Sequence, residues 1–368
     1  MKLTGFQLYR YELPFSEPLT LKGTLLHYRE GLLLELEADD GGQIGRGEVS
    51  PLPGFSRESL EEAADQARDL ASSVLGREVT EDWIDPDGDF SRQLDSMGLA
   101  PSARFGFELA LWNLCAASRG RSLPELIAPR PRTTVAVSAL ISGPPNTALQ
   151  EARGALSAGY EAVKLKVGGR PVEEDVELVR AVREELGDAV ALRLDANRAW
   201  SLEEAARFAG GTSGLRLEYV EEPLADPTLL AAFVRDHGVA VALDESLVGM
   251  EPESLADHPY ARAVVLKPTL LGGISRTLRF AGLASRLGAK PIVSSAYETG
   301  VGTIALAALA AGVGGEEVPA GLDTYRRLAG DVLRPRLDLP APRVDVRAVA
   351  ATRREIDRQL PAYPPRMA

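Results

Sequence analysis

Beyond about residue 131, the chain repeats one unit: a short apolar stretch, a polar turn and an amphipathic helical stretch, such as 172–186 or 277–288. Strands that alternate with helices form parallel β-α-β units, so this repeat constrains the fold more than any other feature of the sequence. The predicted strands are Thr133–Ile141, Ala162–Val167, Ala191–Asp195, Leu217–Glu221, Val239–Asp244, Ala263–Lys267, Lys290–Ser295 and Ala320–Leu322.

Eight such strands over about 190 residues predict an α/β fold of the (β/α)8 TIM-type barrel class. The alternative is an open, doubly wound parallel sheet. It is disfavoured because no glycine-rich dinucleotide fingerprint follows the first strand.

The first part of the chain has a mixed α+β pattern. A strand with Phe6, Leu8 and Tyr11 is expected to end at a proline-bounded turn, Pro14 to Pro18. Two further strands and two helices are expected, with the strands joined by a hairpin turn at Asp40-Gly41-Gly42. These strands are 31–39 and 44–50, a rigid loop follows at 51–56, and the helices are 58–76 and 101–120.

These patterns divide the chain into three parts. We expect an α+β domain over 1–125, a barrel over 126–334, and a proline- and arginine-rich segment over 335–368 that returns to the first domain. The sequence shows no targeting segment, and its longest apolar run, Ile304 to Ala311, is too short to span a bilayer. We therefore expect a cytoplasmic protein without a membrane partner, and leave monomer or homo-oligomer open.

Composition excludes several classes of function. The net charge of −12 repels phosphate backbones, so nucleic acid is not an expected partner. The single cysteine, Cys115, excludes a disulfide framework and a cysteine-based zinc site. The three histidines are far apart in sequence and lack metal-ligand spacing. An anionic substrate would have to meet local positive charge inside a site.

Polar residues close most of the predicted barrel strands, 23 to 29 residues apart, which is about one β-α unit. Catalytic groups of such barrels lie at the carboxyl ends of strands, so these side chains are expected around one barrel mouth. A single acid there could be a solvated loop residue, but three acids flanked by lysines indicate a site. The residues are Lys164 and Lys166, Asp195, Glu221, Asp244, Lys267, and Ser294 and Ser295.

This set of residues predicts proton-transfer chemistry assisted by a metal. Asp195, Glu221 and Asp244 offer three hard oxygen ligands, which suits Mg²⁺ with positions left for substrate oxygens. Lys164 and Lys166 are two apart on a strand and face the same way, so each disfavours the charge of the other, and nearby Mg²⁺ adds to this effect. The lysine pKa is therefore expected to fall toward neutrality, which makes one lysine available as a base. A lysine base beside a cation that polarises a carboxylate is the arrangement for making an enediolate.

Several motifs resemble the enolase superfamily, in its lysine-based, muconate-cycloisomerase-like branch, and within it the o-succinylbenzoate synthase family. The resemblance covers nearly the whole chain. The motifs are GEVSPLPGFS (47–56), RLDANRAW (193–200), YVEEPL (219–224), LDESL (243–247), VLKPTLLGG (265–273), SSAYETGVG (294–302) and GLDTY (321–325).

The resemblance implies a modified barrel with an N-terminal capping domain. It also implies Mg²⁺-dependent dehydration of 2-succinyl-6-hydroxy-2,4-cyclohexadiene-1-carboxylate, a small-molecule carboxylate, in menaquinone biosynthesis. Asp195, Glu221 and Asp244 would bind Mg²⁺, with Mn²⁺ as a substitute. Lys166 would take the α-proton and return it to the departing hydroxide, and Lys267 would stabilise the enediolate.

The resemblance also assigns the residues around the substrate. The loop Ser50 to Ser56 would close over the succinyl end. Apart from the resemblance, Asn197 is expected to support the metal ligands, with a turn-forming role as the alternative. Glu222 and Glu245 are excluded because strand alternation turns them to the other face. Arg193 shares a strand face with Asp195 and could instead pair with a carboxylate. The substrate contacts implied are Lys164, Arg193, Ser294, Ser295, and Gly321 and Leu322 of a bordering turn at 321–324.

Rival functions remain open at the level of sequence. An N-succinylamino-acid racemase or dipeptide epimerase would use the same metal and both lysines. A non-catalytic metal- or ligand-binding barrel would not need two lysines beside the acids. A nicotinamide-dependent reductase lacks a phosphate-binding glycine cluster after the last strands. A histidine-base enzyme is disfavoured because no histidine ends the seventh strand.

Overall fold

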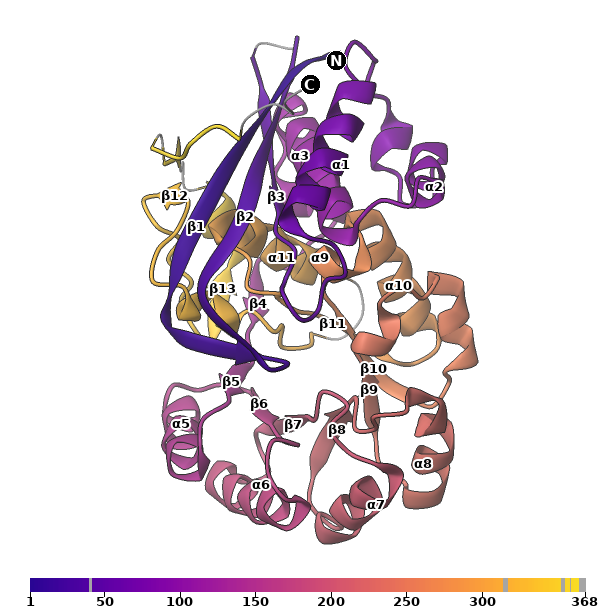
Figure 1. Cartoon of the computed structure of the whole chain (residues 1–368), viewed down its shortest axis with the longest axis vertical. Coiled ribbons are helices and arrows are strands. Elements are labelled where there is room, and N and C mark those ends of the chain that lie inside the picture. The colour runs from indigo at the N-terminus through magenta and orange to yellow at the C-terminus, as the bar shows by residue number, and fades with distance from the viewer. Residues whose placement is uncertain (40–41, 314–316, 352–354, 358, 364–368) are drawn as a thin grey trace.

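The computed structural model describes residues 1–39, 42–313, 317–351, 355–357 and 359–363. Figure 1 shows a cap, built from a long antiparallel sheet and helices, above a ring of strands surrounded by helices. In the part of the chain that the structure describes, no helix is both long enough and apolar enough to cross a membrane.

The cap sheet has three antiparallel strands in the order β1-β2-β3: β1 (Leu3–Leu21), β2 (Thr24–Ala38) and β3 (Ile44–Val49). The helix α3 packs directly against β3. Gly47 and Gly106 permit this approach, because a Cβ on either residue would overlap with the facing backbone or side chain. The cap helices are α1 (Leu60–Ser73), α2 (Asp89–Ser96), α3 (Pro101–Ser118) and α4 (Leu123–Ile127), with a 3-10 turn at Glu81–Ile84.

The predicted turn at Pro14 to Pro18 is wrong. Strand β1 continues through both prolines, with a register irregularity between Pro14 and Leu19. Both prolines are tolerated because β1 is an edge strand and no ladder hydrogen bond is lost on its open side. The chain reverses instead at Lys22 and Gly23, whose φ angles of 46° and 82° match a two-residue hairpin turn. The second expected turn, Asp40-Gly41-Gly42, falls largely outside the described residues.

The barrel strands form one parallel sheet in the order β11-β10-β9-β8-β7-β6-β5, so each strand lies beside the next in sequence. The strands are β5 (Ala139–Ile141), β6 (Ala162–Lys166), β7 (Ala191–Asp195), β8 (Leu217–Glu221), β9 (Val241–Leu243), β10 (Ala261–Leu266) and β11 (Lys290–Val293). The helices are α5 (Pro145–Ser157), α6 (Val172–Leu186), α7 (Leu202–Gly211), α8 (Leu230–His237), α9 (Pro268–Leu271), α10 (Ile274–Arg286) and α11 (Gly300–Gly312).

The ring closes through very short contacts, which confirms the predicted barrel class but shortens its first and last strands. The segment at Ala320 and Gly321 makes single parallel bridges to Val137 on one side and to Ser294 on the other. The predicted first strand is split into β4 (Thr134–Ala136) and β5, because β4 pairs antiparallel with β13 (Arg343–Asp345).

The C-terminal segment runs back to the cap. Ala362 bridges Tyr9 of β1, and Tyr363 donates its backbone N–H to the Leu8 carbonyl. The three-part domain boundaries stay a prediction. The remaining elements are β12 (Leu333–Arg334), just before this segment, and α12 (Val346–Ala351) and β14 (Glu355–Ile356) within it.

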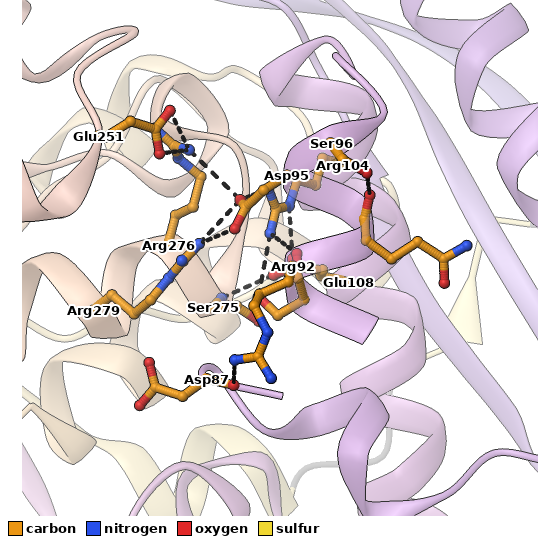
Figure 2. A network of polar contacts seen from close by, with 12 residues as sticks. Asp87, Arg92, Asp95, Ser96, Arg104, Glu108, Glu251, Ser275, Arg276 and Arg279 are labelled. Atoms are coloured by element: carbon orange, nitrogen blue, oxygen red, sulfur yellow. Dashed lines mark hydrogen bonds and ion pairs between the residues drawn. The ribbon is translucent and has the colours of Figure 1, made fainter. Parts of the chain in front are cut away.

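Charged side chains join the cap to the barrel. Figure 2 shows Asp95 of α2 between Arg104 of α3 and Arg279 of α10, with Arg279 Nη2 2.7 Å from Asp95 Oδ2. Nearby, Glu108 of α3 accepts the backbone N–H of Ser275 at the start of α10. Since a helix N-terminus has unpaired N–H groups, the cap supplies the acceptor that this barrel helix lacks.

A second acid does the same at another barrel helix. Glu48 of β3 is fully buried and accepts the backbone N–H groups of Thr299 and Gly302, each 2.9 Å away, at the start of α11. The hydroxyl groups of Thr299 and Tyr11 also donate to Glu48. Burial raises the pKa of Glu48, and the hydrogen bonds from Thr299 oppose that rise.

Candidate active site

The polar residues predicted to end the barrel strands do meet at one mouth. Lys166 of β6 pairs in register with Asp195 of β7, and Asp195 pairs with Glu221 of β8. Asp244 and Lys267 directly follow β9 and β10. All three acids are buried, because parallel strands are covered on both faces and their carboxyl ends converge under the cap.

The lysines of β6 contact the first two acids. Lys164 Nζ lies 2.8 Å from both Asp195 Oδ2 and Glu221 Oε1. Lys166 Nζ lies 2.6 Å from Asp195 Oδ2 and donates to Asn197 Oδ1 at 2.6 Å. Asn197 therefore lies beside the lysine as well as beside the acids.

Lys267 meets this cluster from the other side of the ring. Strands β6 and β10 are separated by three strands in the sheet, so the lysines that end them face each other across the barrel. Lys267 Nζ pairs with Asp244 Oδ2, and its ammonium group lies 5.6 Å from the centre of the Phe55 ring. Positive charge thus borders the acids on both sides.

The expected lowering of a lysine pKa does not occur at Lys164. Burial would lower its pKa, but Asp195 and Glu221 outweigh burial and raise the pKa well above its ordinary value. At Lys267, Asp244 likewise outweighs burial and raises the pKa. Direct contact with carboxylates is stronger than repulsion between neighbouring ammonium groups.

The acids respond differently to the same surroundings. Burial would raise the pKa of Asp195, but Lys164 and Lys166 hold it below its usual range. Burial also raises the pKa of Glu221 well above its ordinary value, and the neighbouring charge of Asp195 adds to that rise. The positive charge around Glu221 is therefore too small to offset its burial, unlike that around Asp195.

The donor set fits a divalent cation of the hard, oxygen-binding kind. Three carboxylates come from three adjacent strand ends, and Glu221 Oε2 is buried with no hydrogen-bond partner. As the side chains lie, no three Asp, Glu, His or Cys residues in the described ranges stand close enough together to hold an ion. Each acid instead faces a lysine ammonium group, so binding an ion requires these contacts to rearrange.

A cavity opens beside the three lysines. Leu52 and Phe55 of the loop after β3 form one wall, so the loop expected to cover the substrate does lie over the barrel mouth. Ser294, Ser295 and Gly321 also line this cavity. The full lining is Leu21, Leu52, Phe55, Ser138, Leu140, Lys164, Lys166, Lys267, Ser294, Ser295, Ala296, Tyr297, Gly321, Asp323 and Thr324.

The structure corrects two predicted substrate contacts. Arg193 does not line the cavity, because its Nε donates to Glu218 at 2.7 Å and its Nη1 to the Pro319 carbonyl, one layer deeper in the barrel. Leu322 is fully buried and does not line this cavity; it lines a separate one with Val137 and Tyr160, because the chain turns into a 3-10 helix directly after it.

The exclusion of Glu245 removed a residue that the structure brings to the site. Glu245 follows Asp244 in a 3-10 turn, and its Oε1 accepts the Asn197 side-chain amide at 3.0 Å. Strand alternation was the wrong rule because β9 ends at Leu243. Glu222 is buried in structural contacts, accepting the backbone N–H groups of Asp244 and Ser246.

Two family models match the chain. The model described as Enolase C-terminal domain-like matches residues 147–350, and the model described as MenC, N-terminal domain, matches residues 3–114. The first covers more than half of the chain and the second covers most of the cap.

Known proteins resemble the chain over almost its full length. The o-succinylbenzoate synthase of Vibrio cholerae serotype O1 (strain ATCC 39315 / El Tor Inaba N16961) is 33% identical over 95% of this chain and 96% of its own. Among solved structures, a dipeptide epimerase from Enterococcus faecalis V583, complexed with Mg and the dipeptide L-Leu-L-Tyr, has a TM-score of 0.83 at 22% identity over 94% of this chain and 97% of its own. An N-succinyl Arg/Lys racemase from Bacillus cereus ATCC 14579 has a TM-score of 0.83 at 21% identity over 97% of this chain and 100% of its own. The chain therefore belongs to the o-succinylbenzoate synthase family of enzymes, within the enolase superfamily.

Proposed function

We propose that the chain catalyses Mg²⁺-dependent dehydration of 2-succinyl-6-hydroxy-2,4-cyclohexadiene-1-carboxylate to 2-succinylbenzoate, a step of menaquinone biosynthesis. The observation that carries the proposal is the cluster of three buried acids between Lys166 and Lys267, which face each other across one cavity. The family membership supports the choice of substrate.

Lys166 is the proposed base. Its side chain lines the cavity, and its Nζ contacts both Asp195 and Asn197. These two contacts fix the orientation of the Lys166 side chain at the end of β6. In its neutral form it would remove the α-proton, and the C–H electron pair would pass into the substrate carboxylate as an enediolate. The carbon–oxygen bond to the hydroxyl would then break, and the proton on Lys166 would join the departing hydroxide to form water.

Asp195, Glu221 and Asp244 would hold the metal ion. Bound Mg²⁺, or Mn²⁺ in its place, supplies a Lewis acid that makes the substrate α-proton easier to remove. Glu221 Oε2, buried and unpartnered, is the ligand atom most in need of a cation. Asp195 and Glu221 raise the pKa of Lys164, and this effect would weaken if they held a cation.

Lys267 would act as a cation on the opposite face of the substrate. Its ammonium group pairs with Asp244, and its largely buried side chain lines the same cavity. A fixed positive charge there stabilises the developing negative charge of the enediolate. Dehydration requires no second proton transfer from this side.

A racemase or epimerase acting on N-succinylamino acids or dipeptides is the second candidate. Lys267 also stands where a second base would stand, and the structural neighbours include a racemase and an epimerase of this shape. Such an enzyme would take a proton from either face, so both lysines would be indispensable.

A spectrophotometric assay of the purified protein with the cyclohexadiene substrate tests the proposal. We expect loss of diene absorbance with Mg²⁺ and none with chelator. Turnover of N-succinylamino acids without turnover of the diene would move the assignment to the second candidate. Turnover of the diene in chelator would contradict the metal-dependent mechanism.

A further inference from the structure

One arginine of the cap contacts both walls of the cavity. Arg29 lies on β2 and is 1% exposed, which is rare for a charged side chain. Its Nε donates to the Tyr297 carbonyl at 3.0 Å and its Nη2 reaches the Ala296 carbonyl at 3.4 Å. Nη1 donates to the backbone carbonyl of Pro51 at 2.7 Å, and Nη2 donates to the backbone carbonyl of Ser50 at 2.5 Å.

Besides these four carbonyls, the guanidinium of Arg29 donates to the backbone carbonyl of Glu30 at 3.1 Å. All five of these acceptors, within the described part of the chain, are backbone carbonyls. Arginine presents five N–H donors in a rigid planar fork, so one side chain can serve carbonyls that point at it from different directions. The contacts of Arg29 therefore fix backbone positions.

The carbonyls belong to two loops that are far apart in sequence. Residues 50 and 51 begin the cap loop that carries Leu52 and Phe55, and residues 296 and 297 belong to the barrel loop after β11. Leu52, Phe55, Ala296 and Tyr297 all line the cavity. Arg29 itself does not line it, so its influence on a ligand is indirect.

The barrel loop needs support from outside. Tyr297 has a φ of 63°, in the left-handed region that costs free energy for a residue with a Cβ. Such a conformation persists where surrounding contacts determine it, and Arg29 supplies one on the Tyr297 carbonyl. The Tyr297 ring also packs edge-on against Phe15 of the cap, at 5.8 Å between ring centres.

We propose that Arg29 is a positioning residue, which sets the spacing of the two cavity walls and through it the affinity for the substrate. The proposal rests on the proposed function only for the identity of the ligand. Lysine would not replace it, because three donors on one nitrogen cannot reach carbonyls of both loops with the same geometry. Since the walls would contact parts of the substrate that do not react, the expected effect is on KM.

The test compares Arg29→Met and Arg29→Lys with Arg279→Met. The control removes another contact between cap and barrel, to Asp95, away from the cavity (Figure 2). We expect KM for the diene to rise about tenfold in Arg29→Met and less in Arg29→Lys, with kcat changed by less than about threefold. Calorimetric titration with 2-succinylbenzoate should show the same loss of affinity, and Arg279→Met should show neither.

Amide hydrogen exchange separates this inference from the proposed function. In Arg29→Lys, exchange at residues 52–56 and 296–298 should be faster than in Arg279→Met, whatever ligand the cavity takes. An inactive wild type would refute the proposed function but leave this arm intact. The proposal would be overturned if Arg29→Lys kept the exchange rates and the KM of the wild type, or if Arg279→Met changed both as much as Arg29→Lys does. Both outcomes can be read even if Arg29→Met fails to fold.

Discussion

The ammonium nitrogen of Lys166 lies 2.6 Å from Oδ2 of Asp195, its register partner on the next strand. One residue is the proposed base and the other a proposed metal ligand, so proton transfer and metal binding meet at a single contact. A cation held by Asp195 would take the place of the Lys166 ammonium group at that oxygen.

Replacing Lys166 tests its role as base. We expect Lys166→Ala to lower kcat for the diene by about 10²–10⁴-fold, the usual contribution of a positioned base. Mg²⁺ binding should persist, because Asp195, Glu221 and Asp244 remain. Stopped-flow absorbance gives kcat, and calorimetry gives the metal affinity. Full activity in Lys166→Ala would rule out the mechanism.

Lys267→Arg distinguishes a cation from a second base. Arginine keeps the positive charge but does not deprotonate in proteins. We expect partial dehydratase activity, within about 100-fold of the parent, since the charge is kept and loss of the whole group would cost about 10²–10³-fold. Lys267→Ala serves as the matched loss of charge. Near-complete loss in both variants would favour obligatory two-base chemistry.

Glu221→Gln probes the metal site with little change of shape. We expect Mg²⁺ affinity to fall at least about tenfold, because even indirect partners of a metal contribute that much. In chelator the melting temperature should not fall, since burial and neighbouring charge already disfavour the ionised Glu221. Unchanged Mg²⁺ affinity would place the metal elsewhere.

Asp95 predicts a pH-dependent contribution to stability. Burial would raise its pKa, but Arg104 and Arg279 hold the pKa below its ordinary value. The stabilisation is therefore present above the unfolded pKa of about 3.9 and is lost as pH falls through the lower, folded pKa. We expect Asp95→Asn to lower the free energy of unfolding at pH 7 by about 1–2 kcal/mol.

Urea unfolding at pH 7 and at lower pH measures this effect. The difference between Asp95→Asn and the parent should shrink below about pH 4, where the unfolded carboxyl is protonated. Asp87→Asn is the control, because its exposed carboxylate stands apart from Arg104 and Arg279, and it should change stability by less than about 0.5 kcal/mol. A difference independent of pH would show that shape, and not charge, decides the effect.

The strand-end residues are predictable because parallel strands place their carboxyl ends at one edge. A period of one β-α unit therefore carries spatial information, and the spacing of Lys166, Asp195, Glu221 and Lys267 is enough to bring them to one barrel mouth. Lys164 departs from the expected fall in pKa because the sequence shows which charges are near each other but not which of them touch.

Contacts that depend on long-range geometry could not be predicted. Arg193 shares a strand face with Asp195, yet it lies one layer deeper in the barrel. There it forms a buried ion pair with Glu218 and does not line the cavity. Arg29 gives no signal in sequence, because the loop carbonyls that it contacts are 21 to 268 residues away. The predicted turn at Pro14 to Pro18 was wrong because prolines are tolerated in an edge strand. Which strand lies at the edge is decided by the order of strands in the sheet.

Glu48 has a consequence for how the molecule comes apart. A chain cut between the cap and the barrel would separate this carboxylate from Thr299 and Gly302, leaving Tyr11 as its donor, and would leave the first turn of α11 without its acceptor. Each half would be destabilised by the loss of these hydrogen bonds, which form only when both halves are together. We therefore expect a single cooperative unfolding transition, and expect halves exchanged between relatives to assemble only when the acid and the start of its helix are inherited together.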